Sequence, residues 1–109
     1  MTDEQITPAM VIREADRIVV KPASDIVAAT VTELRAVLRS ALNDGGMNLL
    51  VIDLEQTQMV DSMGIGLLIS AFNSISKTGG RLEIMNASAD ILSLFKTMRM
   101  HQHFRISGK

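Results

Sequence analysis

The residues with the clearest chemical potential in this chain are an acid, a serine and two glycines in the run Asp61-Ser62-Met63-Gly64-Ile65-Gly66. The apolar run Leu49-Leu50-Val51-Ile52 precedes them and predicts a buried strand. Apolar residues at helical spacing follow them, so we expect Ser62 at or near the start of a helix. Free amides and the positive end of the helix dipole favour an added phosphate group at that position.

The side chains around Ser62 predict a surface that a phosphate would change. We expect Met59, Met63 and Leu67 to form a flat apolar patch beside the serine. A phosphoserine carries about −1.5 to −2 charges, and here it would lie beside the acidic Asp61. A partner that recognises the apolar patch would then be repelled.

Gly64 and Gly66 stand inside the predicted helix, where each glycine costs about 1 kcal/mol relative to alanine. Bare backbone permits a close approach that a side chain would block, so we expect both glycines to keep the backbone open to a partner. A purely structural explanation of the neighbouring acid and serine stands beside this one, because Ser and Asp are the commonest helix caps. The local residue pattern leaves both explanations open.

The predicted helix belongs to an alternation of strands and helices. Two β-branched runs, 10–12 and 18–21, flank a polar turn and predict a hairpin, which Pro22 ends. The remaining predicted elements are a helix from Thr30 to Asn43, a strand at 49–52, a helix from Asp61 or Ser62 to Ser76, a strand at 82–85, a helix that Ser88 caps, and a short tail at 101–106 that ends as extended chain. This order predicts one α/β domain over residues 1–109, with a core of about 8–106 and a mixed sheet against which the helices pack.

Two helix boundaries and two buried faces are specific enough to test. Thr30-Val31-Thr32-Glu33 has the spacing of a capping box, in which a hydroxyl and a carboxylate each bind a free amide. Asp44-Gly45-Gly46 is expected to end that helix. The predicted core faces are Ile65, Leu68, Ile69, Phe72 and Ile75 in the second helix, and Ile91, Leu92, Phe95 and Met98 in the third.

The composition argues against several classes of partner. Lys and Arg number 11 against 12 Asp and Glu, and aromatic residues make up 3% of the chain, so neither a basic surface nor a base-stacking platform is expected and nucleic acid is not a predicted partner. Cysteine is absent. The acidic start of the chain differs from a signal peptide, and no apolar stretch approaches the ~20 residues of a membrane span. We therefore expect a cytoplasmic protein without membrane insertion.

Metal binding and catalysis are not expected. His101 and His103 are the only histidines, and no third ligand is evident near them, so no metal and no cofactor is predicted. A serine hydrolase would need a base beside Ser62, and the residues two before and two after it, Val60 and Gly64, do not form a G-x-S-x-G elbow. Either histidine could still reach the serine in space. An enzyme with Ser62 as nucleophile therefore stays open as a minor hypothesis.

Five segments stand out in order along the chain: Val51 to Leu54, Val60 to Leu68, Gly79 to Leu82, Phe95 to Met98, and Phe104 to Ile106. Taken together, they resemble the STAS domain of bacterial anti-sigma factor antagonists. The resemblance implies that the helices gather mainly on one face of the sheet. It also implies that Ser62 is the phosphorylated serine.

The resemblance further implies a cycle of partners. The unphosphorylated antagonist binds an anti-sigma factor that is also a serine kinase, and so frees a sigma factor. The kinase then uses Mg-ATP to phosphorylate the serine, and a phosphatase of the PP2C type resets the system. Asp61, Met63, Gly64, Gly66 and Met59 are the residues expected to contact the partner. The chain would be the substrate and ligand in this cycle, not an enzyme.

Two residues depart from the family pattern. The family often has Ser or Thr where this chain has Met63, which leaves Ser62 as the only acceptor in the element. Many antagonists have Asp before the first helix where this chain has Val27, a change expected to alter phosphate geometry or kinase recognition. The alternative role within the same fold is that of an unphosphorylated subunit of a lipid-transport or other membrane-associated complex. A transporter tail is a further variant, but it would follow membrane helices.

Overall fold

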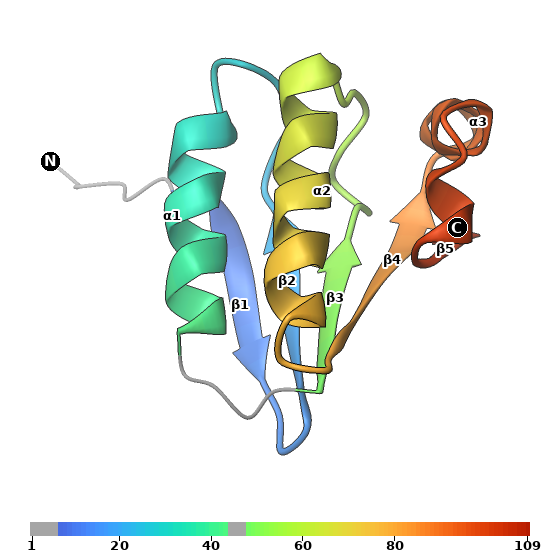
Figure 1. Cartoon of the computed structure of the whole chain (residues 1–109). Coiled ribbons are helices and arrows are strands. Elements are labelled where there is room, and N and C mark those ends of the chain that lie inside the picture. Colours follow the sequence, from blue (N-terminus) through green and yellow to red (C-terminus); the bar gives the residue numbers. More distant parts are fainter. Residues whose placement is uncertain (1–6, 44–47) are drawn as a thin grey trace, which may run out of the picture.

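The sheet begins with the predicted hairpin. In the computed structural model, which describes residues 7–43 and 48–109, β1 (Ala9–Arg13) and β2 (Arg17–Pro22) pair antiparallel (Figure 1). Pro22 is the last residue of β2. The prediction that this proline ends the strand is confirmed, because proline has no amide hydrogen for a further ladder bond.

Three further strands extend the sheet in parallel. They are β3 (Leu49–Asp53), β4 (Arg81–Ala87) and β5 (Arg105–Gly108), and the strand order is β1-β2-β3-β4-β5. The predicted tail at 101–106 is wrong in part, since a 3-10 turn at Met100–Gln102 comes first and a fifth strand follows. Only four residues long and mostly exposed, β5 carries too little hydrophobic alternation to be recognised from sequence.

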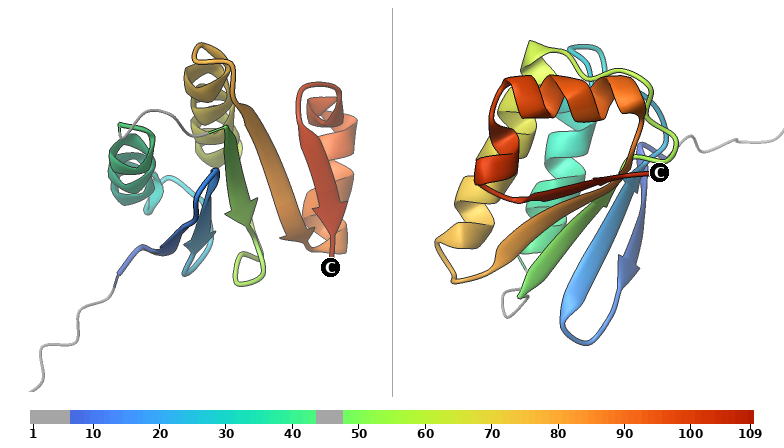
Figure 2. Two further views of the ribbon diagram at one scale, coloured as in Figure 1. Left: turned by 90° about the horizontal axis from the view of Figure 1, so that it is seen from below. Right: turned by 90° about the vertical axis from the view of Figure 1, so that its right-hand side faces the viewer.

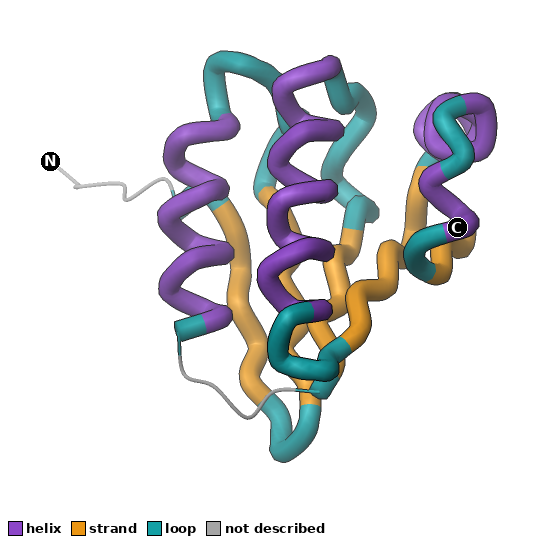
Figure 3. The backbone as a smooth tube through the Cα atoms, viewed as in Figure 1, coloured by secondary structure: helices purple, strands orange, loops and turns teal. Residues whose placement is uncertain are grey.

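The three predicted helices are present: α1 (Val31–Leu42), α2 (Ser62–Ser76) and α3 (Ala89–Thr97). Figure 2 shows α1 and α2 over the same face of the sheet, with α3 beside β4 and β5. Each parallel strand pair is joined by a crossover that contains an α-helix, the usual connection between parallel strands (Figure 3). The α/β fold with helices mainly on one face is confirmed.

Alternate residues of the three central strands make the core face of the sheet. They are Ile18 and Val20 of β2, Leu50 and Ile52 of β3, and Leu82 and Ile84 of β4, all buried. The helices cover them with leucine, isoleucine and valine side chains and with Phe95, the only one of the three phenylalanines that is fully buried. The sheet, α1 and α2 therefore form one packed unit that fixes the loops at its edge.

The predicted capping box at Thr30 is wrong. Thr30 precedes α1, but its side chain makes no cap hydrogen bond, and its backbone is already close to helical. The Thr30 hydroxyl instead donates to the Asp25 carbonyl at 2.7 Å and accepts from the Val27 amide at 3.1 Å. A capping hydroxyl needs an extended backbone, and the turn over residues 27–30 denies it that geometry. The predicted end of this helix at Asp44-Gly45-Gly46 lies outside the described residues.

One predicted core residue of α2 is exposed. Ile65, Leu68 and Ile75 are buried and Phe72 is half-buried, as expected, but Ile69 is 42% exposed. Leu67, which was expected on the surface patch, is buried instead. The reason is that α2 packs against both the sheet and α1, so its buried stripe is displaced toward the α1 side.

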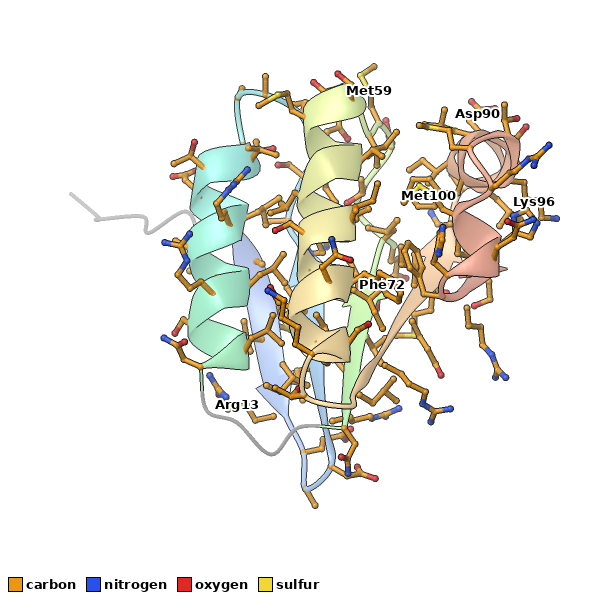
Figure 4. All side chains as sticks on the ribbon, in the orientation of Figure 1. Arg13, Met59, Phe72, Asp90, Lys96 and Met100 are labelled. Atoms are coloured by element: carbon orange, nitrogen blue, oxygen red, sulfur yellow. The ribbon has the colours of Figure 1, made fainter. Side chains whose placement is uncertain are left out.

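The end of α3 differs in the same way. Ile91 and Phe95 are buried and Leu92 is half-buried, as predicted, but Met98 is 49% exposed. The chain leaves the helix at Met98, and Arg99 then adopts a left-handed conformation with φ 60°. That turn carries Met100, not Met98, into the core. Figure 4 shows Met100 on the inner side of this segment, toward α2.

Candidate functional site

The predicted switch residues lie at one edge of the sheet, where the parallel strands β2 and β3 end. The segment 24–28 follows β2, and the segment 57–61 follows β3. Ile26 and Val60 form a parallel bridge between them. The Ile26 amide donates to the Met59 carbonyl at 3.0 Å, and the Asp61 amide donates to the Ile26 carbonyl at 3.2 Å. We call these two segments the paired loops.

Two carboxylates tie the paired loops in opposite directions. Asp25 Oδ1 accepts from the amides of Gln58 at 2.9 Å and Met59 at 3.1 Å. Asp61 Oδ2 accepts from the Ala28 amide at 2.9 Å. Each loop thus supplies an acid that satisfies backbone donors of the other loop.

Asp25 was not predicted from the sequence as a residue of this site. The departure from the family pattern lies at Val27, yet a carboxylate lies two residues earlier, against the backbone of the segment that leads to Ser62. A signal was available, because the carboxyl ends of parallel strands meet at one edge. An acid soon after β2 is therefore brought close to residues soon after β3.

Two buried polar side chains hold the loop after β3. The Thr57 hydroxyl, 1% exposed, donates to the Ser24 carbonyl at 2.9 Å and so adds a third link between the paired loops. Asp53, at the end of β3, accepts from the Glu55 amide at 3.0 Å and from the Asn86 side-chain amide at 2.9 Å. Buried polar groups are stable only when paired in this way.

Asp61 caps α2. Its backbone is extended, and Oδ1 accepts from the Gly64 amide at 2.9 Å. Hydrogen bonds from the amides of Gly64, Ala28 and Met63 lower the pKa of the Asp61 carboxyl below its ordinary value of 3.8. The acid is therefore a structural cap, and the same side chain fixes the loop before α1.

Ser62 is the first residue of α2 and is exposed. Among the described residues, no hydrogen bond engages its hydroxyl. Asp61 takes the capping role, so capping does not explain the serine. The hydroxyl stands at the positive end of a 15-residue helix and is accessible to a modifying enzyme.

Two methionines flank this serine on the surface. Met59 is 58% exposed and Met63 is 50% exposed. Figure 4 places Met59 at the end of the molecule where α2 begins. Because Leu67 is buried, the apolar patch consists of Met59 and Met63 without the third member that the sequence predicted.

The two glycines of α2 have different surroundings. A Cβ atom on Gly64 would lie 2.2 Å from the Ile26 carbonyl oxygen and 2.8 Å from Val60 Cγ1. The close approach at Gly64 is thus made by the chain's own paired loop. A Cβ on Gly66 would have no neighbour within 4 Å, and this residue is exposed.

The histidines lie in a different setting. His101 and His103 are both exposed, and the His103 ring packs 5.7 Å from the Phe72 ring. Within residues 7–43 and 48–109, no group of three potential ligands is arranged to hold a metal ion. The same ranges contain no helix with the length and apolarity needed to cross a membrane.

The model of the STAS domain family matches residues 9–109. The chain belongs to the STAS domain family.

Solved structures share the fold of this STAS domain at low sequence identity. An anti-sigma factor antagonist from Mycobacterium paratuberculosis is 19% identical with a TM-score of 0.81, covering 93% of this chain and 85% of that one. An anti-sigma-factor antagonist (STAS) domain protein from Planctomyces limnophilus is 19% identical with a TM-score of 0.82, covering 93% and 90%. The Bacillus cell fate determinant SpoIIAA in its phosphorylated form is 17% identical with a TM-score of 0.71, covering 93% and 92%.

Proposed function

We propose that this STAS domain is an anti-sigma factor antagonist whose binding to an anti-sigma factor is switched by phosphorylation of Ser62. The observation that carries the proposal is the exposed Ser62 hydroxyl at the first position of α2, which has no capping role because Asp61 holds it. Similar folds include antagonists, one of which has been solved in a phosphorylated form.

Phosphorylation of Ser62 would add more negative charge than its neighbouring side chains carry. The half-exposed Met59 and Met63 carry no charge, and Asp61 already carries one negative charge. A phosphate of about −1.5 to −2 charges on Ser62 would place close to three negative charges on two adjacent residues. A partner surface that is complementary to two methionines would lose contacts and meet an anion.

The proposed partner is an anti-sigma factor that also acts as the serine kinase, and a PP2C-type phosphatase would reverse the modification. The chain itself would be a substrate and a ligand in this cycle. Asp61 and Gly64 would act on the partner site indirectly, since they position the paired loops. Met59, Met63 and Gly66 are exposed and would contact the partner directly.

The first test is phosphopeptide mass spectrometry after incubation with host cytosol and Mg-ATP. We expect phosphate on Ser62 and none at that site in Ser62→Ala. The exposed Ser70 and Ser74 of the same helix serve as internal controls for unspecific kinases. Absence of phosphate beside an active kinase control would contradict the switch and favour an unphosphorylated subunit of a membrane-associated complex.

The second test is a binding measurement on the anti-sigma factor that copurifies with the Ser62→Ala variant. We expect Ser62→Asp to weaken binding by at least about tenfold, because it adds a charge beside Asp61. Ser62→Asn adds similar bulk without charge and should bind nearly as well as the parent chain. Equal affinities for the Asp and Ala variants would rule out a charge-gated site.

A further inference from the structure

A groove of about 280 Å³ runs between α1 and α2, away from the paired loops. Its floor is apolar and includes Leu38, Leu67 and Ala71, all buried. Ser62 does not line it. Leu67 of α2 is part of this floor, and the polar Ser70 and Ser74 of the same helix also line the groove.

The α1 rim of the groove is positively charged. Arg35 and Arg39 lie one helical turn apart, and both line the groove and are exposed. Neither forms an ion pair with a carboxylate in the part of the chain that the structure describes. Like charges at this spacing repel each other, so an anion between them would relieve an unfavourable pair.

The opposite rim offers neutral hydrogen-bond donors. Ser70 and Ser74 of α2 line the groove across from the arginines, and Asn43, the residue after α1, lines it as well. Among the described residues that line the groove, none is acidic. Two guanidinium groups, two hydroxyls and one amide therefore face a single space above an apolar floor.

The helix dipole explains one of the arginines but not the other. Arg39 lies in the last turn of α1, where a cation stabilises the negative end of the helix. Arg35 lies in the second turn and has no such role. The position of Arg35 is therefore the better indicator of a ligand.

We propose that this groove binds a small phosphate monoester. Its dianion matches the two positive charges, and its three terminal oxygens accept bidentate hydrogen bonds from arginine and further bonds from the serine hydroxyls. The apolar floor contacts the organic part of the ester. This site is independent of the phosphorylation proposed at Ser62, because it requires neither that serine nor a kinase.

The experiment is an NMR titration of the labelled full chain with n-butyl phosphate at constant ionic strength. We expect saturable shifts confined to the amides of α1 and the middle of α2, with a dissociation constant of about 1 mM. Inorganic phosphate should bind the same residues more weakly, since it lacks the apolar organic part. Added sodium chloride and 1-butanol at the same concentration should give no saturable shift.

Variants of the arginines decide whether the groove is the site. Arg35→Gln should weaken binding roughly tenfold, and Arg35→Lys should fall between, because lysine keeps the charge but not the forked donors. Arg81→Gln, at the exposed start of β4, is the matched control and should bind like the parent chain. Arg35 is exposed, so its variants should melt at the parent temperature. Unchanged affinity in Arg35→Gln, or chloride shifts equal to those of the ester, would overturn the proposal.

Discussion

Gly64 and Gly66 stand two residues apart in α2, and the space around their Cα atoms differs completely. At Gly64 an added Cβ would meet the Ile26 carbonyl at 2.2 Å, which is backbone and cannot rotate away. At Gly66 the same atom would have no neighbour within 4 Å. The pair therefore separates the two reasons for a helical glycine, internal packing and an open surface.

Alanine substitutions should give opposite results at the two sites. Gly64→Ala should lower the free energy of unfolding by about 1–3 kcal/mol, because the paired loop must move away from α2. Gly66→Ala should raise it by about 0.5–1 kcal/mol, because alanine has the better helix propensity. Urea denaturation measures both, and equal effects would contradict the contact at Ile26. If Gly66 contacts the partner as proposed, the more stable Gly66→Ala chain should bind it less tightly.

We expect Asp61 to make the stability of the fold depend on pH. Its pKa is lower in the folded chain than its ordinary value of 3.8, because the amides of Gly64, Ala28 and Met63 donate to the charged form. The unfolded chain therefore takes up this proton first as the pH falls. The contribution is complete above the ordinary pKa and is lost as the pH falls through the folded pKa.

The measurement is the thermal midpoint of the parent chain and of Asp61→Asn between about pH 6 and about pH 2. We expect the asparagine variant to melt several degrees lower near pH 6, and the difference to shrink toward the acid end. Asn keeps one acceptor oxygen for the cap, so the helix should still form. A difference that stays constant over this range would show that the Asp61 charge does not contribute.

At the scale of the elements, the ends of the helices were harder to predict from the sequence than the presence of the helices. The helical spacing of apolar residues located α1, α2 and α3, because periodic burial leaves a direct trace in the sequence. The capping box at Thr30 was wrongly predicted because Thr30 also ends a turn over residues 27–30, in which its hydroxyl donates to the Asp25 carbonyl of the preceding loop. At the end of α3, the left-handed Arg99 is not a residue type that signals such a turn, so the place of Met98 could not be predicted.

The corrected end of α3 leads to a test with a matched pair of methionines. Met100 is 2% exposed, so Met100→Ala should cost about 2–5 kcal/mol through the cavity it leaves. Met98 is half-exposed, and Met98→Ala should change the free energy of unfolding by at most about 0.5 kcal/mol. Chemical denaturation compares the two. A larger loss of stability in Met98→Ala than in Met100→Ala would instead support the buried face of α3 that the sequence predicted.

At the scale of the whole molecule, the candidate site depends on contacts between segments far apart in the chain. The sequence pattern located Ser62 at a helix start and the methionines beside it. It did not reveal that Asp25 and Ala28 lie against residues 58–61, because contacts over more than 30 residues leave no periodic trace. The alternation of strands and helices predicted only that both loops lie at the same edge of the sheet.

The residues from Phe104 onward, which include the fifth strand, make contacts that the folded domain needs. Phe104 is buried and its ring lies 5.6 Å from that of Phe72, while β5 pairs with β4 through Glu83 opposite Arg105. A chain that ends at His103 would lose the buried Phe104 side chain and the pairing of β5 with β4. The loss of Phe104 alone costs about 3–5 kcal/mol of unfolding free energy. Domains of this size are stable by only about 5–15 kcal/mol in total. We therefore expect the shortened chain to be largely unfolded or aggregated at 37 °C in circular dichroism melts, whereas removal of Lys109 alone should leave the melt unchanged. A shortened chain that melts like the parent would show that β4 forms a stable edge without β5.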